Sequence, residues 1–181
     1  MPYAPPPDLA GLSLDRIAAL VAQRKLPPLD SWSPPNEGDS LMRIADDGTW
    51  FHDGGRITRP AMVRAFASLL TRDGAGHHWL MTPHEKLRIA VDDAAFVAVD
   101  VRDTGGALAF RLNTDDLVIA GPEHRLIARG TIDAPAIYLQ VRHGIEARLN
   151  RSTWGQLAEV MLTGDGTSVT SQGVRFALVP G

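Results

Sequence analysis

The sequence predicts an α+β protein built from two small related units, each combining a β-hairpin, a helix and a strand. Three observations predict this class: apolar residues alternate between helical and strand periods, tight-turn residues separate the strand-like segments, and one stretch resembles a later one. The connections between strands are too short to hold crossover helices, so we expect antiparallel sheets. We expect the two units to pack about a pseudo-two-fold seam, preceded by an N-terminal arm and a short helix.

Residues 1–38 are predicted to form a proline-rich arm, a short helix and a linker. Four prolines within the first 12 residues favour an extended arm. Ser13 is placed to cap a helix whose apolar residues recur at helical spacing: Leu14, Ile17, Ala18 and Val21. Pro27 and Pro28 end that helix, and residues 27–40 are rich in proline, which predicts a loop.

Residues 39–101 are predicted to form the first unit. Asp47-Gly48 and Gly54-Gly55 are hairpin signals between short strand-like runs. Pro60 suits the first turn of a helix that Asp73-Gly74 is predicted to end. The apolar stripe of this helix consists of Met62, Val63, Phe66, Leu69 and Leu70. From residue 86 the apolar period changes to two, which predicts strands that meet at an Asp92-Asp93 turn.

Residues 102–181 are predicted to form the second unit. Strand-like runs continue to residue 149, with a hairpin turn at His143-Gly144. Ser152 is predicted to cap a second helix, and residues 174–179 a last strand.

An internal repeat relates the two helical segments. At a constant offset, residues 57–74 and 149–166 are identical at five of 18 positions, among them Arg59 with Arg151 and Asp73-Gly74 with Asp165-Gly166. The order of hairpin, arginine, helix, Asp-Gly and strand is the same in both copies. The seam between two such units is a favoured place for a ligand.

Composition excludes several classes of site. The chain has 181 residues, no cysteine and a formal net charge of −3, with 18 Lys+Arg against 21 Asp+Glu. Disulfides, thiolate metal sites and a cysteine nucleophile are therefore excluded. Without a basic cluster, a signal peptide or a membrane-length apolar run, we expect a cytoplasmic protein that binds neither nucleic acid nor membrane.

Polar clusters offer weaker candidates, and none of the specific nucleotide, nucleophile or zinc motifs is present. Residues 82–86 (Thr-Pro-His-Glu-Lys) gather polar groups that could fix a ligand or could equally form a solvated proline turn. The histidines 77, 78, 84 and 124 invite a metal site, but neighbouring residues of a strand point to opposite faces. We predict no metal and no cofactor, and we read the Asp92-Asp93 and Asp115-Asp116 pairs as turns.

Arginines supply the most specific functional hint. Arg59 and Arg151 each precede a predicted helix, where backbone N–H groups and a guanidinium together suit an anion. Salt bridges to acidic residues across the seam are an equally good interpretation.

Several stretches together resemble the bacterial domain-of-unknown-function 1285 family, from about Arg43 to the C-terminus. The most specific are Thr82-Pro83-His84-Glu85-Lys86 and Gly121-Pro122-Glu123-His124, with Val141-Arg142-His143-Gly144 further along. The chain departs from the family pattern at Ala95 and at Thr153-Trp154, neither of which touches a candidate polar group.

The resemblance implies a two-part α+β fold with a cleft between the parts, and no established enzyme activity. It also implies a nucleotide-like ligand and a role in signal transduction. Together with the arginine pattern, it predicts a ligand-binding set: Thr82, Glu85, Lys86, Asn113, Glu123, His124, Arg142, Arg151 and Arg59.

We therefore expect a non-enzymatic ligand-binding or sensory module that takes a small anionic ligand, such as a nucleotide, between the two units. One alternative is a small hydrolase-type enzyme that uses His124 or His84 with a neighbouring glutamate. Another is a protein-interaction module that uses the proline arm and the tryptophans. The sequence does not predict the oligomeric state.

Overall fold

The computed structural model describes residues 11–180, and these form two compact units. Unit 1 consists of Lys25–Ala95 and Arg142–Ile145, and unit 2 of residues 11–24, Phe96–Val141 and residues 146–180. The predicted proline-rich arm lies outside the described residues, apart from Gly11 and Leu12. The α+β class with two similar units is confirmed.

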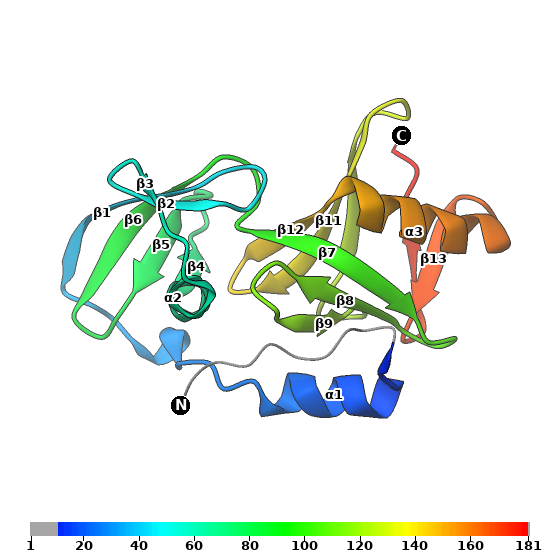
Figure 1. Cartoon of the computed structure of the whole chain (residues 1–181), viewed down its shortest axis with the longest axis horizontal. Coiled ribbons are helices and arrows are strands. Elements are labelled where there is room, and N and C mark those ends of the chain that lie inside the picture. Colours follow the sequence, from blue (N-terminus) through cyan, green and yellow to red (C-terminus); the bar gives the residue numbers. More distant parts are fainter. Residues whose placement is uncertain (1–10, 181) are drawn as a thin grey trace. The chain divides into compact units, whose positions relative to one another are not determined.

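In unit 1, one six-stranded sheet carries a short helix on one side (Figure 1). Its elements are η2 (Leu29–Ser31), β1 (Asn36–Ile44), β2 (Trp50–His52), β3 (Gly55–Arg56), α2 (Pro60–Ala67), β4 (Leu70–Arg72), β5 (His78–Met81) and β6 (Glu85–Val91).

Unit 2 has a second six-stranded sheet and, in addition, a two-stranded sheet. Its elements are α1 (Leu14–Gln23), β7 (Phe96–Asp103), β8 (Leu108–Leu112), β9 (Leu117–Ile119), β10 (Leu126–Gly130), β11 (Pro135–Arg142), β12 (Ile145–Leu149), α3 (Arg151–Thr163), β13 (Ser168–Ser171) and β14 (Val174–Ala177).

The two large sheets have the same topology. Their strand orders are β3-β2-β1-β6-β5-β4 and β10-β11-β12-β7-β8-β9. Each sheet thus consists of two three-stranded meanders, which are joined at its centre by the pairing of the strands that come first and last in the sequence. Those central pairs, β1 with β6 and β12 with β7, are parallel. The other pairings described within the sheets are antiparallel, as expected from the short connections.

This topology corrects the alignment of the predicted repeat. Helix α2 lies between the third and fourth strands of its sheet, whereas α3 follows the sixth. Leu70-Thr71 belongs to β4, while Leu162-Thr163 ends α3. The relationship between the units is therefore one of sheet topology, and the two helices are not equivalent.

Tight hairpins end where the sequence supplies residues that tolerate a positive φ. His143 and Gly144 have φ of 50° and 76° between β11 and β12, as the predicted turn requires. Asp53 and Gly54, at 47° and 82°, make a similar turn between β2 and β3. The turn predicted at Gly54-Gly55 is therefore shifted by one residue.

Helix α1 confirms the predicted cap and apolar face of the N-terminal helix, although it ends at Gln23, before Pro27, and it belongs to unit 2. The Ser13 side chain accepts a hydrogen bond from Arg16 N at 3.2 Å, which caps the helix. The apolar face, with Ile17 fully buried, packs with Leu12 against Ala109 of β8. The helix also contacts β9, an edge strand of its sheet.

Three local predictions are wrong for identifiable reasons. Helix α2 ends at Ala67, because Leu70–Arg72 pairs with β5 and Asp73 instead shapes the β4–β5 turn. Helix α3 is capped by Asn150, whose Oδ1 accepts from Thr153 N at 2.8 Å, and not by Ser152. The predicted loop at residues 27–40 contains the first half of β1, which gains hydrogen bonds only through its distant partner β6.

None of the helices within residues 11–180 is long and apolar enough to span a membrane.

Candidate functional site

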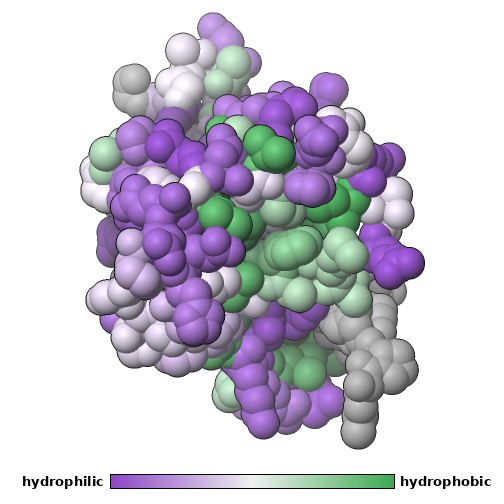
Figure 2. All heavy atoms as spheres, turned by 90° about the vertical axis from the view of Figure 1, so that its left-hand side faces the viewer, coloured by the Kyte–Doolittle hydropathy of each residue, from purple (hydrophilic) through white to green (hydrophobic). Residues whose placement is uncertain are grey.

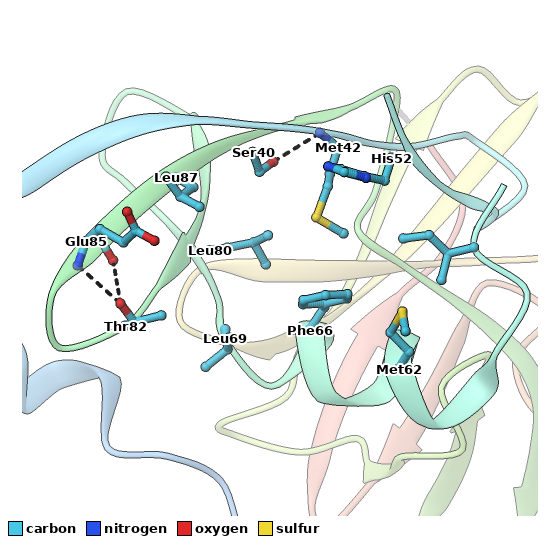
Figure 3. Close-up of a pocket in the computed structure, with 11 residues that line it drawn as sticks. Ser40, Met42, His52, Met62, Phe66, Leu69, Leu80, Thr82, Glu85 and Leu87 are labelled. Carbon is cyan, nitrogen blue, oxygen red and sulfur yellow. Dashed lines mark hydrogen bonds between the residues drawn. The ribbon is translucent and has the colours of Figure 1, made fainter. Parts of the chain in front are cut away.

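A pocket of about 440 Å³ lies between helix α2 and the sheet of unit 1 (Figure 3). The sheet forms one wall and the helix the other, so both walls come from the same unit. The lining consists of Ser40, Met42, His52, Ile57, Met62, Phe66, Leu69, Leu80, Thr82, Glu85 and Leu87.

The walls are apolar because two periodicities place apolar side chains opposite one another. Met42 on β1 and Leu80 on β5 point from the sheet and are buried. Met62 and Phe66, one helical turn apart, project from α2 toward them. Met62 remains 40% exposed, so the helix leaves apolar surface uncovered.

The surface of the molecule also carries uncovered apolar side chains. Figure 2 shows a face on which hydrophobic side chains gather in the middle and hydrophilic ones surround them. Leu26, Leu41 and Met62 are the large hydrophobic residues of unit 1 that are exposed among the described residues.

The two hydroxyl groups of the lining are engaged by the backbone. Ser40 Oγ donates to Arg88 O at 2.7 Å and accepts from Met42 N at 3.1 Å. This bridges the irregularity where β1 shifts its register against β6. Thr82 Oγ1 donates to Glu85 O at 3.1 Å and accepts from Glu85 N at 3.1 Å. Both hydroxyls therefore stabilise local structure first, and little of their capacity is left for a ligand.

Glu85 and His52 supply the polar groups of the lining that can still form hydrogen bonds or ion pairs with a ligand. Glu85 begins β6, His52 ends β2, and both residues are exposed. Within the described part of the chain, no hydrogen bond or ion pair engages the carboxylate of Glu85 or the imidazole of His52. The pocket thus combines apolar walls with one free carboxylate and one free imidazole.

The Thr-Pro-His-Glu-Lys motif is a turn between β5 and β6. Thr82 N donates to Glu85 O at 2.9 Å, which closes the turn around Pro83. Lys86, the next residue along β6, points to the opposite face of the sheet from Glu85. There its Nζ lies 3.2 Å from Glu37 Oε1 and 4.4 Å from the centroid of the Trp79 ring. Of the predicted residues in this motif, Thr82 and Glu85 therefore line the pocket and Lys86 does not.

Two predicted arginines lie at the ends of α2. Arg59 is the N-cap residue, with an exposed side chain that makes no capping hydrogen bond. Arg142 Nη2 donates to Ala67 O in the last turn, at a long 3.5 Å, where a cation is favourable. Neither residue lines the pocket.

The other four predicted residues belong to unit 2. Asn113 Oδ1 accepts from Val97 N at 3.0 Å, and His124 Nδ1 lies 3.1 Å from Gln140 O, so both tie backbone segments together. Glu123 is exposed in the β9–β10 loop, and Arg151 is the exposed first residue of α3. The predicted set is thus divided between the two units.

Paired aspartates act as turn and ion-pair residues, as expected. Asp92 accepts two hydrogen bonds from Arg43 Nε and one from Nη2, at 2.8–3.1 Å, and these keep the pKa of its carboxyl below the usual value. Asp115 pairs with Arg111 at 2.6 Å. Residues 11–180 contain no group of three or more His, Asp or Glu side chains that could hold a metal ion.

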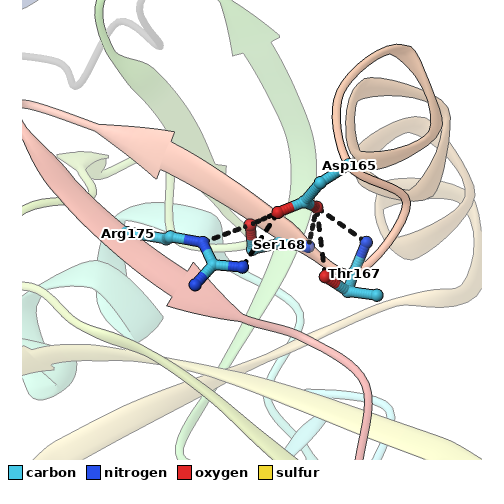
Figure 4. A network of polar contacts seen from close by, with 4 residues as sticks. All are labelled: Asp165, Thr167, Ser168 and Arg175. Carbon is cyan, nitrogen blue, oxygen red and sulfur yellow. Dashed lines mark hydrogen bonds and ion pairs between the residues drawn. The ribbon is translucent and has the colours of Figure 1, made fainter.

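A second polar cluster, in unit 2, is structural. Asp165 accepts hydrogen bonds from the backbone N–H groups of Thr167 and Ser168, from the Ser168 hydroxyl at 2.6 Å and from Arg175 Nη2 at 2.9 Å (Figure 4). The hydroxyl of Ser168, then the backbone of Thr167 and then Arg175, hold the pKa of this carboxyl well below its usual range. These contacts hold the turn between α3 and β13 and tie it to Arg175 of β14.

Sequence reasoning missed Ser40 and His52, and it assigned Met62, Phe66 and Leu69 to a core-facing stripe. An apolar stripe looks the same in a sequence whether it faces packed side chains or a hollow. His52 ends a short strand and carries no motif, so no sequence signal marked it.

Comparisons with known proteins identify relatives for both units. Residues 27–94 match the model "Domain of unknown function (DUF1285), N-terminal domain", and residues 95–178 match "Protein of unknown function (DUF1285), C-terminal domain". A DUF1285 family protein from Silicibacter pomeroyi DSS-3 has a crystal structure with a TM-score of 0.79 and 39% identity. That match covers 90% of this chain and 94% of that chain.

A second crystal structure, of a DUF1285 family protein from Shewanella baltica OS155, has a TM-score of 0.55 at 24% identity. It covers 66% of this chain and 91% of that chain, and it supports the fold alone. The search of curated proteins gives no match.

Proposed function

The chain belongs to the DUF1285 family, and from this premise we propose that it is a non-enzymatic ligand-binding module whose ligand occupies the pocket of unit 1. The observation that carries the proposal is the pocket of about 440 Å³ with apolar walls and few polar groups. Small-molecule sites are typically about 300–1,000 Å³ and have this composition.

Binding fits the lining better than nucleophilic catalysis does. The hydroxyls of Ser40 and Thr82 donate their protons to backbone carbonyls, at 2.7 and 3.1 Å. A nucleophilic hydroxyl needs a general base within hydrogen-bonding reach, and these protons are already directed elsewhere.

The position of α2 supports a sensory role. This helix forms one wall of the pocket, and its last turn accepts a hydrogen bond from Arg142. Arg142 ends β11 and His143 lies in the turn that follows, where His143 O accepts from Arg72 N of β4 at 3.0 Å. A ligand that shifts α2 would therefore strain or relax contacts with a segment continuous in sequence with unit 2.

The test is a thermal-shift screen of small molecules against the wild-type chain and two tryptophan variants. Met62→Trp fills the pocket, whereas Ala61→Trp adds the same ring at an exposed neighbouring position outside the lining. A ligand at 100 times its dissociation constant stabilises the fold by about 2.7 kcal/mol, a melting shift of several °C. We expect hits for wild type and Ala61→Trp that disappear in Met62→Trp; hits that persist in Met62→Trp place the ligand elsewhere.

The same screen examines the anionic ligand expected from the sequence. No arginine or lysine lines the pocket, while the side chains of Arg59 and Arg151 have no hydrogen-bond or ion-pair partner within the described residues. A nucleotide hit that survives Met62→Trp and is lost in Arg59→Ala or Arg151→Ala would support an anion site at those arginines.

A further inference from the structure

We infer that the ligand of the unit 1 pocket is an amphipathic cation, with an apolar body between α2 and the sheet and an ammonium-type group against Glu85. This inference rests on the proposed function and adds the chemical class of the ligand. It begins from the juxtaposition of apolar walls and a single free carboxylate in the lining.

The lining holds few groups that can carry a charge. Glu85 is its one acidic residue, it includes no lysine or arginine, and its other titratable side chain is the imidazole of His52. The adjacent cation, Lys86, points to the other face of β6 and pairs there with Glu37. The strand period thus separates the two neighbouring charges, and the carboxylate is left without a compensating cation from its own strand.

Other acidic groups of unit 1 show what a structural role looks like. Asp92 is held by three hydrogen bonds from Arg43. Asp73 accepts from Trp79 Nε1 at 3.0 Å and from two backbone N–H groups of its turn. Glu85 contributes only its backbone to the turn that precedes β6, and its side chain lines the pocket beside Thr82 (Figure 3).

The apolar walls determine the chemistry of the rest of the ligand. Met42, Leu80 and Phe66 face the hollow from both sides, so an alkyl or aromatic body gains by leaving water. A carboxylate or phosphate placed at the same end would meet the like charge of Glu85. A neutral hydroxyl group could occupy the same end of the pocket, but it would form no ion pair with Glu85.

The experiment uses three probes with the same alkyl chain: octylamine, 1-octanol and octanoate. Each is titrated calorimetrically at pH 7 into the full chain as wild type, Glu85→Gln and Glu159→Gln. Glu159 is an exposed glutamate of α3 that belongs neither to the lining nor to the predicted ligand-binding set, so its variant has the same change in net charge without altering the pocket. Gln keeps the shape of the side chain, and the turn at Glu85 depends on backbone atoms.

We expect octylamine to bind about 1.5- to fivefold more tightly than 1-octanol, the advantage of an exposed ion pair, and octanoate to bind weakest. The advantage should vanish in Glu85→Gln and persist in Glu159→Gln. Equal affinities for octylamine and 1-octanol, or an amine advantage unchanged by Glu85→Gln, overturn the inference.

Met62→Trp separates failure of the inference from failure of the proposed function. If 1-octanol and octylamine bind equally and both are lost in Met62→Trp, the pocket binds ligands but the cation preference is refuted. If none of the probes binds wild type, or binding survives Met62→Trp, the proposed pocket falls and the inference falls with it.

Discussion

Units 1 and 2 share a sheet topology but differ in how the sheet is covered. In unit 2, the interior is filled by side chains with almost no exposure, among them Phe96, Phe110, Leu112 and Leu139. In unit 1, Phe66 and Leu69 remain half-buried beside the hollow that α2 leaves.

The difference indicates that the covering of the sheet, rather than its topology, decides where a pocket forms. Helix α2 has eight residues and spans about 12 Å, whereas α3 has 13 residues and spans about 20 Å. A shorter helix covers less of a sheet of similar size, and the uncovered area becomes available to a ligand.

Replacing matched phenylalanines tests this difference with the largest expected effect. Phe110→Ala empties a fully buried site, so we expect the free energy of unfolding to fall by about 3–5 kcal/mol. Phe66→Ala removes a half-buried ring that stacks on Trp50 with centroids 6.5 Å apart, and should cost about 1–2 kcal/mol. Urea denaturation measures both, and equal losses would mean that unit 1 is packed as tightly as unit 2.

The two helix N-termini provide a second comparison. Asn150 caps α3, so Asn150→Ala should lower the free energy of unfolding by about 1 kcal/mol. Arg59 occupies the N-cap of α2 in an extended conformation without capping it, so Arg59→Ser should raise stability by about 0.5–1 kcal/mol. A loss of stability in Arg59→Ser would show that the arginine side chain has a structural role.

Removing a buried hydroxyl group in unit 2 should change stability by a smaller amount, and it should not lower it. Thr153 is fully buried, and its Oγ1 has no hydrogen-bond partner within the described structure. Valine has the same shape without the unsatisfied polar atom, so Thr153→Val should be neutral or stabilising by up to about 1 kcal/mol. Thermal denaturation measures the change, and a clear loss would reveal a partner such as a bound water.

Two aspartates that shape turns, Asp73 in unit 1 and Asp165 in unit 2, should make stability depend on pH under acidic conditions. Trp79 Nε1, followed by the His77 backbone, lowers the pKa of Asp73 to about 2 from a usual value of 3.8. The pKa of Asp165 is lowered further. A depressed pKa in the folded state stabilises the protein above the unfolded pKa, and this contribution disappears as the pH falls through the folded pKa.

We therefore expect wild-type stability to fall as the pH drops from about 4 toward 2. Asp73→Asn should reduce the slope of the free energy of unfolding against pH between about pH 4 and 2. Asp165→Asn should reduce this slope over a range that also starts near pH 4 but extends to lower pH. Both carboxylates are partly exposed, so each slope change should be small. Urea titrations between pH 5 and 2 measure the slopes, with Glu123→Gln as the control; identical slopes in all variants would contradict the role of these turns.

Local signals in the sequence predicted local structure well. Ser13 and the spacing of Leu14, Ile17 and Val21 predicted α1, and His143-Gly144 predicted the β11–β12 turn. Segments that depend on distant partners were missed: β4 is three residues long, and the first half of β1 pairs with β6 some 50 residues later. Their hydrogen bonds are set by tertiary packing, which a local pattern does not encode.

The candidate site was predicted only in part, for a related reason. Thr82 and Glu85 were found because a compact polar motif contains them, and the structure places both at the pocket. The apolar lining was read as core, since a hollow depends on how far α2 reaches over the sheet. All residues of the predicted set, Thr82 and Glu85 included, stay predictions as ligand contacts.

The position of α1 has a consequence for how the chain is made. This helix packs in unit 2 beside β8 and β9, yet all of residues 25–95 of unit 1 are translated between them. At typical rates of about 5–20 residues per second, Leu117 leaves the ribosome roughly 5–20 s after Gln23. During that interval the apolar face of α1 lacks the strands against which it packs. The nascent chain therefore exposes an amphipathic segment that chaperones can bind.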